Sequence, residues 1–127
     1  MSNPKKIFIV DDDNFLLDMY VLKFNQGGFE VSTSLGSIAA LTRLREGFSP
    51  DILLLDIMMP EMDGFELLEK IKEENLSKDS IKIILSNRGQ QSDILRGESL
   101  GVSGYIVKAT STPTEVINKV NEIINKS

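Results

Sequence analysis

The chain has 127 residues, of which 41% are hydrophobic and 26% charged, so we expect one globular domain over residues 1–127 and no disorder. It contains no cysteine and no histidine, which excludes disulfides, thiolate or imidazole metal sites and serine–histidine hydrolase chemistry. A net charge of −5, short apolar runs and the lack of a secretory signal argue against nucleic-acid binding and membrane insertion, and we expect a cytoplasmic protein.

Short runs rich in Ile, Leu and Val recur along the chain and predict five strands. The runs are Ile7–Val10, Phe29–Thr33, Ile52–Leu55, Ile81–Leu85 and Tyr105–Val107, and the second is the weakest. Uninterrupted apolar runs are typical of strands that are buried on both faces, as in parallel sheets.

The segments between these runs have helical patterns. They cover residues 15–24, 38–44, 65–71 after an Asp63-Gly64 start, 91–100, and 113–124 after a Thr112…Glu115 capping box. The segment 15–24 is apolar almost all round, so we expect its neighbours to cover it well. The segment 91–100 is the weakest, because Gly97 costs about 1 kcal/mol relative to alanine.

Five strand–helix repeats predict an α/β fold. Strands that are joined through helices run parallel and have right-handed crossovers. The expected architecture is therefore an open doubly wound sheet or a three-layer sandwich, since a barrel of this type needs eight such units.

Polar residues directly follow four of the predicted strands. They are Asp11, Asp12, Asp13, Asp56, Ser86 and Lys108. Ligand sites in open α/β sheets form beyond the carboxyl ends of the strands, so we expect these side chains at one edge. Clustered carboxylates favour a cation, and Mg²⁺ suits them. Mg²⁺ beside a lysine and a hydroxyl indicates phosphoryl chemistry, and without His or Cys we expect an aspartate nucleophile.

Four segments of the chain resemble the receiver domain of two-component response regulators, the CheY-like family. They are residues 7–13, 51–64, 83–86 and 101–108, in the family's order and spacing. Residues 51–64 are specific on their own, and the resemblance extends over essentially the whole chain. It implies a flavodoxin-like (βα)5 doubly wound sandwich whose five-stranded parallel sheet has the order 2-1-3-4-5.

The same resemblance implies roles for the acidic residues. Asp56 would accept the phosphoryl group, as an aspartyl phosphate. Asp12 would bind Mg²⁺ directly and Asp11 through water, with Asp56 and the backbone carbonyl of Met58 completing the protein's share of the coordination. Mn²⁺ would be able to substitute for Mg²⁺.

Three further residues would convert phosphorylation into a change of shape. Lys108 would pair with the phosphoryl oxygens, and Ser86 would hydrogen-bond the phosphoryl group and move toward it. Tyr105 would then turn inward, and the face formed by the fourth helix, fifth strand and fifth helix would change. The resemblance therefore implies a signalling switch that assists its own phosphorylation and dephosphorylation, and not an enzyme.

The implied partners are other proteins. The phosphodonor would be a histidine kinase or a histidine phosphotransfer protein, since the chain has no histidine of its own. The output partner is not identifiable from the sequence, and phosphorylation could also produce a homodimer through the switching face. Both a stand-alone receiver and a piece of a longer regulator are compatible with this chain.

Four positions bear on how the site would behave. Asn87 and Ala109 stand where the family usually has alanine and proline, and we expect a trans Lys108–Ala109 bond because a non-proline cis bond costs about 2.5–4 kcal/mol. Met58 and Arg88 occupy the positions that tune hydrolysis of the phosphoryl group. Met58 cannot position a water by hydrogen bonding, so we expect slow self-dephosphorylation.

Alternative interpretations explain fewer of these residues. The run Asp11–Asp13 could simply carry helix N-terminal charges, a role we expect for Asp13. A phosphatase of the haloacid dehalogenase type would use Asp11 and Asp13, but it needs an acidic pair after Lys108 and leaves Asp56 without a role. A phosphorylation-independent binding module would not need the complete set, and a flavodoxin-like cofactor binder lacks its phosphate loop.

Overall fold

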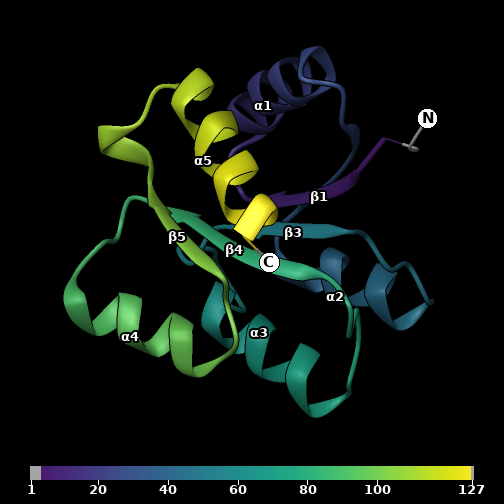
Figure 1. The fold of residues 1–127 in the computed structure, drawn as a ribbon. Coiled ribbons are helices and arrows are strands. Elements are labelled where there is room, and N and C mark those ends of the chain that lie inside the picture. The colour runs from purple at the N-terminus through teal and green to yellow at the C-terminus, as the bar shows by residue number, and fades with distance from the viewer. Residues whose placement is uncertain (1–3, 127) are drawn as a thin grey trace.

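The computed structural model describes residues 4–126 and contains five strands and five α-helices in strict alternation (Figure 1). The strands are β1 (Lys6–Asp11), β2 (Glu30–Leu35), β3 (Ile52–Leu55), β4 (Ile81–Ser86) and β5 (Gly104–Val107). The helices are α1 (Asn14–Gln26), α2 (Ser37–Arg45), α3 (Gly64–Glu73), α4 (Gln91–Ser99) and α5 (Pro113–Lys126). A short 3-10 helix, Lys108–Thr110, follows β5. Within residues 4–126, no helix combines the length and hydropathy needed to cross a membrane.

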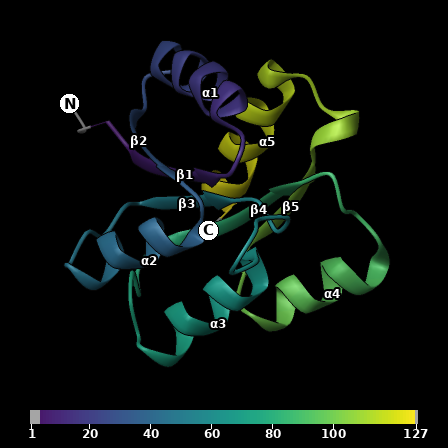
Figure 2. The ribbon, with the colours of Figure 1, turned by 180° about the vertical axis from the view of Figure 1, so that it is seen from behind.

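All strand pairs are parallel, and the sheet order is β2-β1-β3-β4-β5. This confirms the doubly wound fold expected from the sequence. Helices α1 and α5 cover one face of the sheet, and α2, α3 and α4 cover the other (Figures 1 and 2). The register aligns Val10 of β1 with Leu55 of β3, so the residues that follow these two strands emerge side by side.

Two apolar cores lie on the two faces of the sheet. Along β1, Phe8 and Val10 belong to the core under α2 and α3, whereas Ile7 and Ile9 belong to the core under α1 and α5. All four side chains are at most 1% exposed. Burial on both faces is why the strand sequences are apolar at every position instead of at alternate ones.

Side-chain caps fix where three of the helices begin. Asp13 caps α1 through its side chain, as expected. Asp63 and Glu66 form a reciprocal capping box at α3, with 2.8 Å between the Glu66 amide nitrogen and Asp63 Oδ1. Thr112 and Glu115 form the same arrangement at α5, as the sequence predicts. Each cap satisfies amide groups that the first helical turn leaves without partners.

Helix α1 is less covered than its composition suggests. Leu17, Tyr20 and Phe24 are buried, but Phe15 is 78% exposed and Leu22 is 56% exposed. The expectation that neighbours cover this helix all round is therefore wrong. The helix packs on the sheet and on α5 along one face, and its other apolar side chains reach solvent.

Helix α4 exists where the sequence predicts it least strongly. Its glycine, Gly97, is buried, and a Cβ atom there would lie 2.8 Å from Ile84 Cδ1 and 3.1 Å from Val102 Cγ2. Glycine therefore lets α4 approach β4 closely, which offsets the loss of helix propensity.

Candidate functional site

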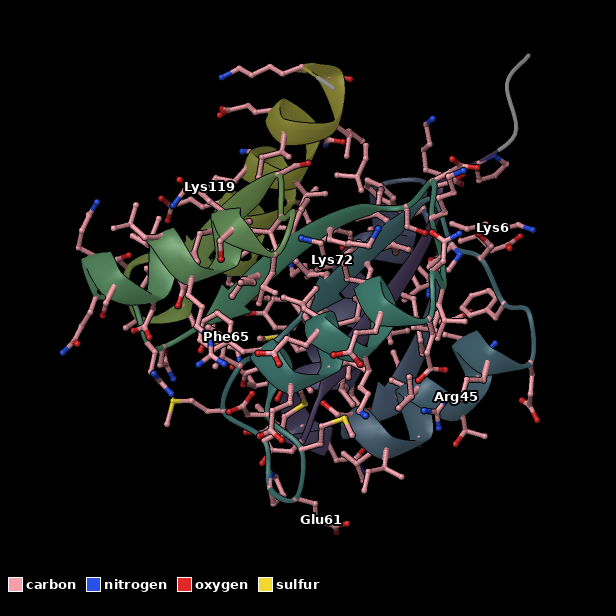
Figure 3. All side chains as sticks on the ribbon, turned by 90° about the horizontal axis from the view of Figure 1, so that it is seen from below. Lys6, Arg45, Glu61, Phe65, Lys72 and Lys119 are labelled. Carbon is pink, nitrogen blue, oxygen red and sulfur yellow. The ribbon has the colours of Figure 1, made fainter. Side chains whose placement is uncertain are left out.

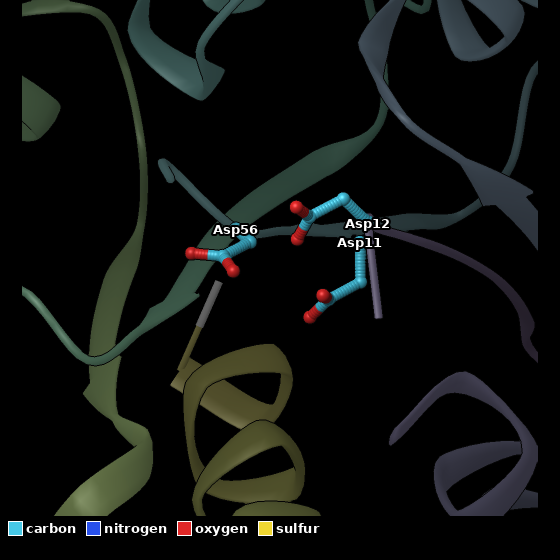
Figure 4. A group of neighbouring side chains, drawn as sticks. All are labelled: Asp11, Asp12 and Asp56. Atoms are coloured by element: carbon cyan, nitrogen blue, oxygen red, sulfur yellow. The ribbon is translucent and has the colours of Figure 1, made fainter. Parts of the chain in front are cut away.

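The ends of β1 and β3 bring three carboxylates together. Asp11 is the last residue of β1, and Asp56 directly follows β3 with its amide nitrogen 3.0 Å from the Val10 carbonyl oxygen. Asp12 follows Asp11. Carboxylate oxygens of the three aspartates lie within 4.8 Å of one another, and Figure 4 shows the three side chains next to one another. We call Asp11, Asp12 and Asp56 the acidic cluster.

Lys108 enters the acidic cluster from the edge of the sheet. It follows β5, two strands away from β3, and its side chain extends inward to two of the aspartates. The distance from Lys108 Nζ is 2.6 Å to Asp11 Oδ2 and 3.0 Å to Asp56 Oδ2. The three side chains are only 9%, 3% and 7% exposed, respectively, so water screens these ion pairs weakly.

Backbone amides hold the remaining oxygens of the two buried carboxylates. The Asp13 amide nitrogen lies 3.0 Å from Asp11 Oδ1, and the Met58 amide nitrogen lies 3.1 Å from Asp56 Oδ1. Each carboxylate therefore accepts from Lys108 on one side and from the main chain on the other. Asp12, in contrast, is exposed at the mouth of the cluster.

Burial and ion pairing shift the pKa values of Asp11 and Lys108. Burial raises the pKa of the Asp11 carboxyl group, and its bond to Lys108 only partly opposes this. For Lys108, burial is the largest single influence and lowers the pKa of the ammonium group, but Asp11 and Asp56 together raise it above its ordinary value. Lys108 is thus held as a cation by the two carboxylates.

The donor set fits a hard divalent cation. Three carboxylates and one ammonium group leave an excess of negative charge at the cluster, and all the available ligand atoms are oxygens. Mg²⁺ is commonly bound by one or two carboxylates while it keeps several waters. The exposed Asp12 leaves the cluster accessible from the solvent side.

Gly64 allows the start of α3 to pack directly against the backbone of Asp56. A Cβ atom on Gly64, the first residue of α3, would overlap the Asp56 carbonyl oxygen and lie 2.8 Å from Ile57 Cα. Helix α3 therefore begins directly against the backbone that carries Asp56. The side chain of Met58, two residues beyond Asp56, is 52% exposed and leaves this side of the cluster open.

The predicted switch residues meet around Arg88 in the β4–α4 loop. Ser86 is the last residue of β4 and is fully buried, and its Oγ accepts a hydrogen bond from the Arg88 amide nitrogen at 3.3 Å. The half-buried Tyr105 donates its hydroxyl hydrogen bond to the Arg88 carbonyl oxygen. The Arg88 guanidinium pairs with α4, where it lies 2.7 Å from Asp93 Oδ1.

Asn87 and Ala109, which differ from the usual family residues, lie in different structural environments. Asn87 is exposed, and its side chain makes no hydrogen bond to another residue of 4–126. Ala109 lies in the 3-10 helix, and since the described residues contain no cis peptide bond, the expected trans Lys108–Ala109 bond is confirmed.

Sequence reasoning missed two contacts. The Lys108–Asp11 ion pair joins residues 97 positions apart, and hydrophobic patterning places both at strand ends without saying which strands are close enough for contact. The Arg88–Asp93 pair has a weak local signal, because an acid in the first turn of a helix follows a nearby arginine.

Comparisons with known proteins identify the family of this chain. The family description "Response regulator receiver domain" matches residues 7–121. The chain is 34% identical over 122 residues to the phosphate regulon transcriptional regulatory protein PhoB of Rhizobium meliloti, covering 96% of this chain and 53% of that protein. It is 30% identical over 120 residues to the response regulator SaeR of Staphylococcus aureus, covering 94% and 50%.

A solved structure shows the same fold over nearly the full length of both chains. The CheY-like response regulator receiver domain protein from Methanospirillum hungatei has a TM-score of 0.85 and 28% identity, covering 97% of this chain and 95% of that one. The chain spans about half the length of the curated relatives it matches. By the family match and the shared fold, it belongs to the response regulator receiver domains of two-component systems.

Proposed function

We propose that residues 1–127 form one receiver unit that accepts a phosphoryl group on Asp56. The observation that carries this proposal is the buried Asp56 carboxylate, which lies 3.0 Å from Lys108 Nζ and within the acidic cluster. Because the chain has no histidine, the donor is a phosphohistidine on a partner histidine kinase or phosphotransfer protein.

The side chains around Asp56 have distinct roles in the transfer. A carboxylate oxygen of Asp56 forms a bond to phosphorus while the bond from phosphorus to the donor nitrogen breaks, and the imidazole leaves with the electron pair. Lys108 donates hydrogen bonds to the phosphoryl oxygens and offsets their charge, which lowers the barrier to transfer. Its position beside Asp56 before transfer means that little rearrangement is needed.

Asp11, Asp12 and Asp56, with the backbone carbonyl of Met58, would hold Mg²⁺, or Mn²⁺ in its place. The bound ion would supply positive charge to the transferred phosphoryl group. Asp11 would be the fixed ligand, because it is buried and accepts a hydrogen bond from the Asp13 amide. Asp12 would be the accessible ligand, because it is exposed.

Ser86 and Tyr105 would pass the signal from the site to α4. When the Ser86 hydroxyl turns to donate to the phosphoryl group, its bond from the Arg88 amide is disturbed, and so is the Arg88 carbonyl that Tyr105 uses. This changes the relative populations of the conformations of the α4–β5–α5 face, where an output protein or a second copy of the chain would bind.

The lifetime of the phosphorylated form would be long. The exposed Met58 side chain offers no hydrogen bond to an attacking water, and the Arg88 guanidinium is engaged by Asp93. We therefore infer slow hydrolysis, as suits a signalling switch and not a phosphatase with turnover.

Acetyl phosphate labelling tests the proposal. The protein is incubated with Mg²⁺ and acetyl phosphate and is analysed by intact-mass spectrometry, with Asp56→Asn alongside and the exposed Asp79→Asn as the matched control. We expect one phosphoryl group on the wild type and on Asp79→Asn, none on Asp56→Asn, and none with EDTA. Labelling of Asp56→Asn, or neither labelling nor beryllofluoride binding by the wild type, would overturn the proposal.

A further inference from the structure

A groove of about 220 Å³ lies at the opposite edge of the sheet from the acidic cluster. It runs between the end of α3, the loop from α3 to β4, and the end of α4. Three lysines and three leucines contribute to its lining: Lys72, Lys78, Lys82, Leu68, Leu76 and Leu100. We call it the lysine groove. Figure 3 labels Lys72 on α3, whose side chain extends toward α4.

The lysine groove is positively charged in an acidic protein. The chain has a net charge of −5, yet no aspartate or glutamate lines the groove in the part of the chain that the structure describes. Elsewhere the cations Arg45, Arg88, Arg96 and Lys108 each form an ion pair with a carboxylate. The groove lysines form no ion pair with a residue of 4–126, and in this they resemble Lys23, Arg43 and Lys70.

The partners of the groove lysines are neutral. Lys82 Nζ lies 3.0 Å from the carbonyl oxygens of both Ser77 and Ser80, and Lys72 Nζ lies 3.5 Å from the carbonyl oxygen of Ser99. Lys78 has no hydrogen bond or ion pair to any other residue of 4–126. Three lysines therefore contribute to the lining of a partly apolar groove without a carboxylate in ion-pair contact.

Of the three groove lysines, Lys82 gives the strongest support for an anion site. It is the second residue of β4 and is half-buried, and burial lowers the pKa of its ammonium group, while the charge of Asp79 only partly opposes this. An ammonium group has three N–H donors, and the two carbonyl bonds leave one for a ligand. An anion in the groove would offset the cost of desolvating this charge.

We propose that the lysine groove binds a small organic anion, with its oxyanion head among the lysines and a short apolar body against Leu68, Leu76 and Leu100. The volume is below the roughly 300–1,000 Å³ of pockets for drug-sized ligands, which favours a small ligand. Because the groove lies at the amino ends of the strands, this site is separate from the acidic cluster.

Titration with sodium hexanoate tests the site, with 1-hexanol as the uncharged match and sodium chloride at equal ionic strength as the salt control. Amide signals are followed in ¹⁵N–¹H correlation spectra. We expect saturable shifts at Leu76, Lys82, Leu100 and Gly101, at least tenfold weaker binding of 1-hexanol, and no saturable shift with the salt. Equal binding of 1-hexanol, or shifts that do not saturate or fall elsewhere, would overturn the proposal.

Variants locate the charge requirement. Lys82→Met keeps much of the side-chain length and removes the charge, and we expect it to weaken hexanoate binding at least fivefold. Lys70→Gln, an exposed lysine of α3 outside the groove, should bind hexanoate like the wild type. If Lys82→Met does not fold, Lys72→Gln/Lys78→Gln takes its place with the same expectation. Unchanged affinity in the folded variants contradicts the proposal.

Discussion

Helices α3 and α4 lie next to each other on the same face of the sheet, but they are held in different ways (Figure 2). Helix α3 begins with a capping box and buries Phe65, Leu67, Leu68 and Ile71. Helix α4 has no side-chain hydrogen bond at its N-cap, and only Asp93 and Gly97 are buried along it. One helix is fixed by apolar burial, and the other is not.

The contacts that hold α4 are mainly polar and partly exposed. Arg96 pairs with Glu69 of α3 at 2.9 Å and lies over the Phe65 ring at 4.5 Å, and Asp93 pairs with the half-exposed Arg88. Exposed ion pairs contribute about 0–1 kcal/mol each, whereas burial of a large apolar side chain contributes about 1.5–3 kcal/mol. A small change in free energy can therefore displace α4 and leave α3 in place.

The largest expected difference is between apolar truncations in the two helices. Phe65→Ala removes a ring that is 1% exposed and should lower the free energy of unfolding by about 3–5 kcal/mol. Leu95→Ala in α4 removes a side chain that is 53% exposed and should change it by less than about 0.5 kcal/mol. Urea unfolding measures both. Similar losses in the free energy of unfolding for the two variants would contradict the proposed difference between α3 and α4.

The two buried glycines give the next test. Gly64→Ala places a methyl group against the backbone of Asp56 and Ile57, which cannot move aside cheaply, and should cost about 3 kcal/mol. Gly97→Ala meets the side chains of Ile84 and Val102, which can adjust, and gains about 1 kcal/mol of helix propensity. Thermal unfolding should show a large loss only for Gly64→Ala, and a larger loss for Gly97→Ala would reverse our reasoning.

Changes at the helix caps should have smaller and opposite effects. Asp63→Ala removes the α3 cap and should cost about 1 kcal/mol. Gln90→Ser supplies a cap to α4, whose N-cap residue already has the extended backbone that a cap needs, and should gain about 0.5–1 kcal/mol. Hydrogen exchange should show greater protection in α4 for Gln90→Ser. Unchanged protection would mean that the cap does not limit α4.

Titration of Tyr105 gives the smallest effect but reports directly on α4. Burial, with the charge of Asp93, raises the pKa of Tyr105 from 10 to about 12. Because the folded-state value is the higher one, the associated stability is fully present below pH 10 and is lost as the pH rises through 12. Absorbance at 295 nm should show this late phenolate, which Tyr105→Phe removes. Tyr20, the other tyrosine, also has a raised pKa. A phenolate titration midpoint near pH 10 in the wild type would therefore contradict the burial of these two side chains.

The sequence predicts most of the fold because burial on both faces of a sheet leaves a continuous apolar signal. The β3 run Ile52–Leu55 is predicted with its observed bounds, and β4 differs by a single residue, Ser86. The weak β2 run is displaced by a residue or two, because four of the six residues of this edge strand are polar, including the buried Ser34. The 3-10 helix after β5 has no periodic signal, so hydrophobic patterning does not predict it.

The candidate site was predictable where strand ends determine position. Asp11, Asp12, Asp56 and Lys108 meet as expected, because parallel strands end at one edge. The contacts of Arg88 were not predictable, since a loop of irregular backbone decides where its guanidinium points. The roles of Ser86 and Tyr105 in switching stay predictions.

The ion pair between Lys108 and Asp11 has a consequence for how the protein is made. Translation at about 5–20 residues per second delivers Lys108 roughly 5–20 s after Asp11. A nascent chain that lacks β5 has the two acids of the future site but not their cation. Burying a charge without its partner costs about 3–5 kcal/mol, so we expect the carboxyl ends of β1 and β3 to become stably packed only after β5 and Lys108 have been made.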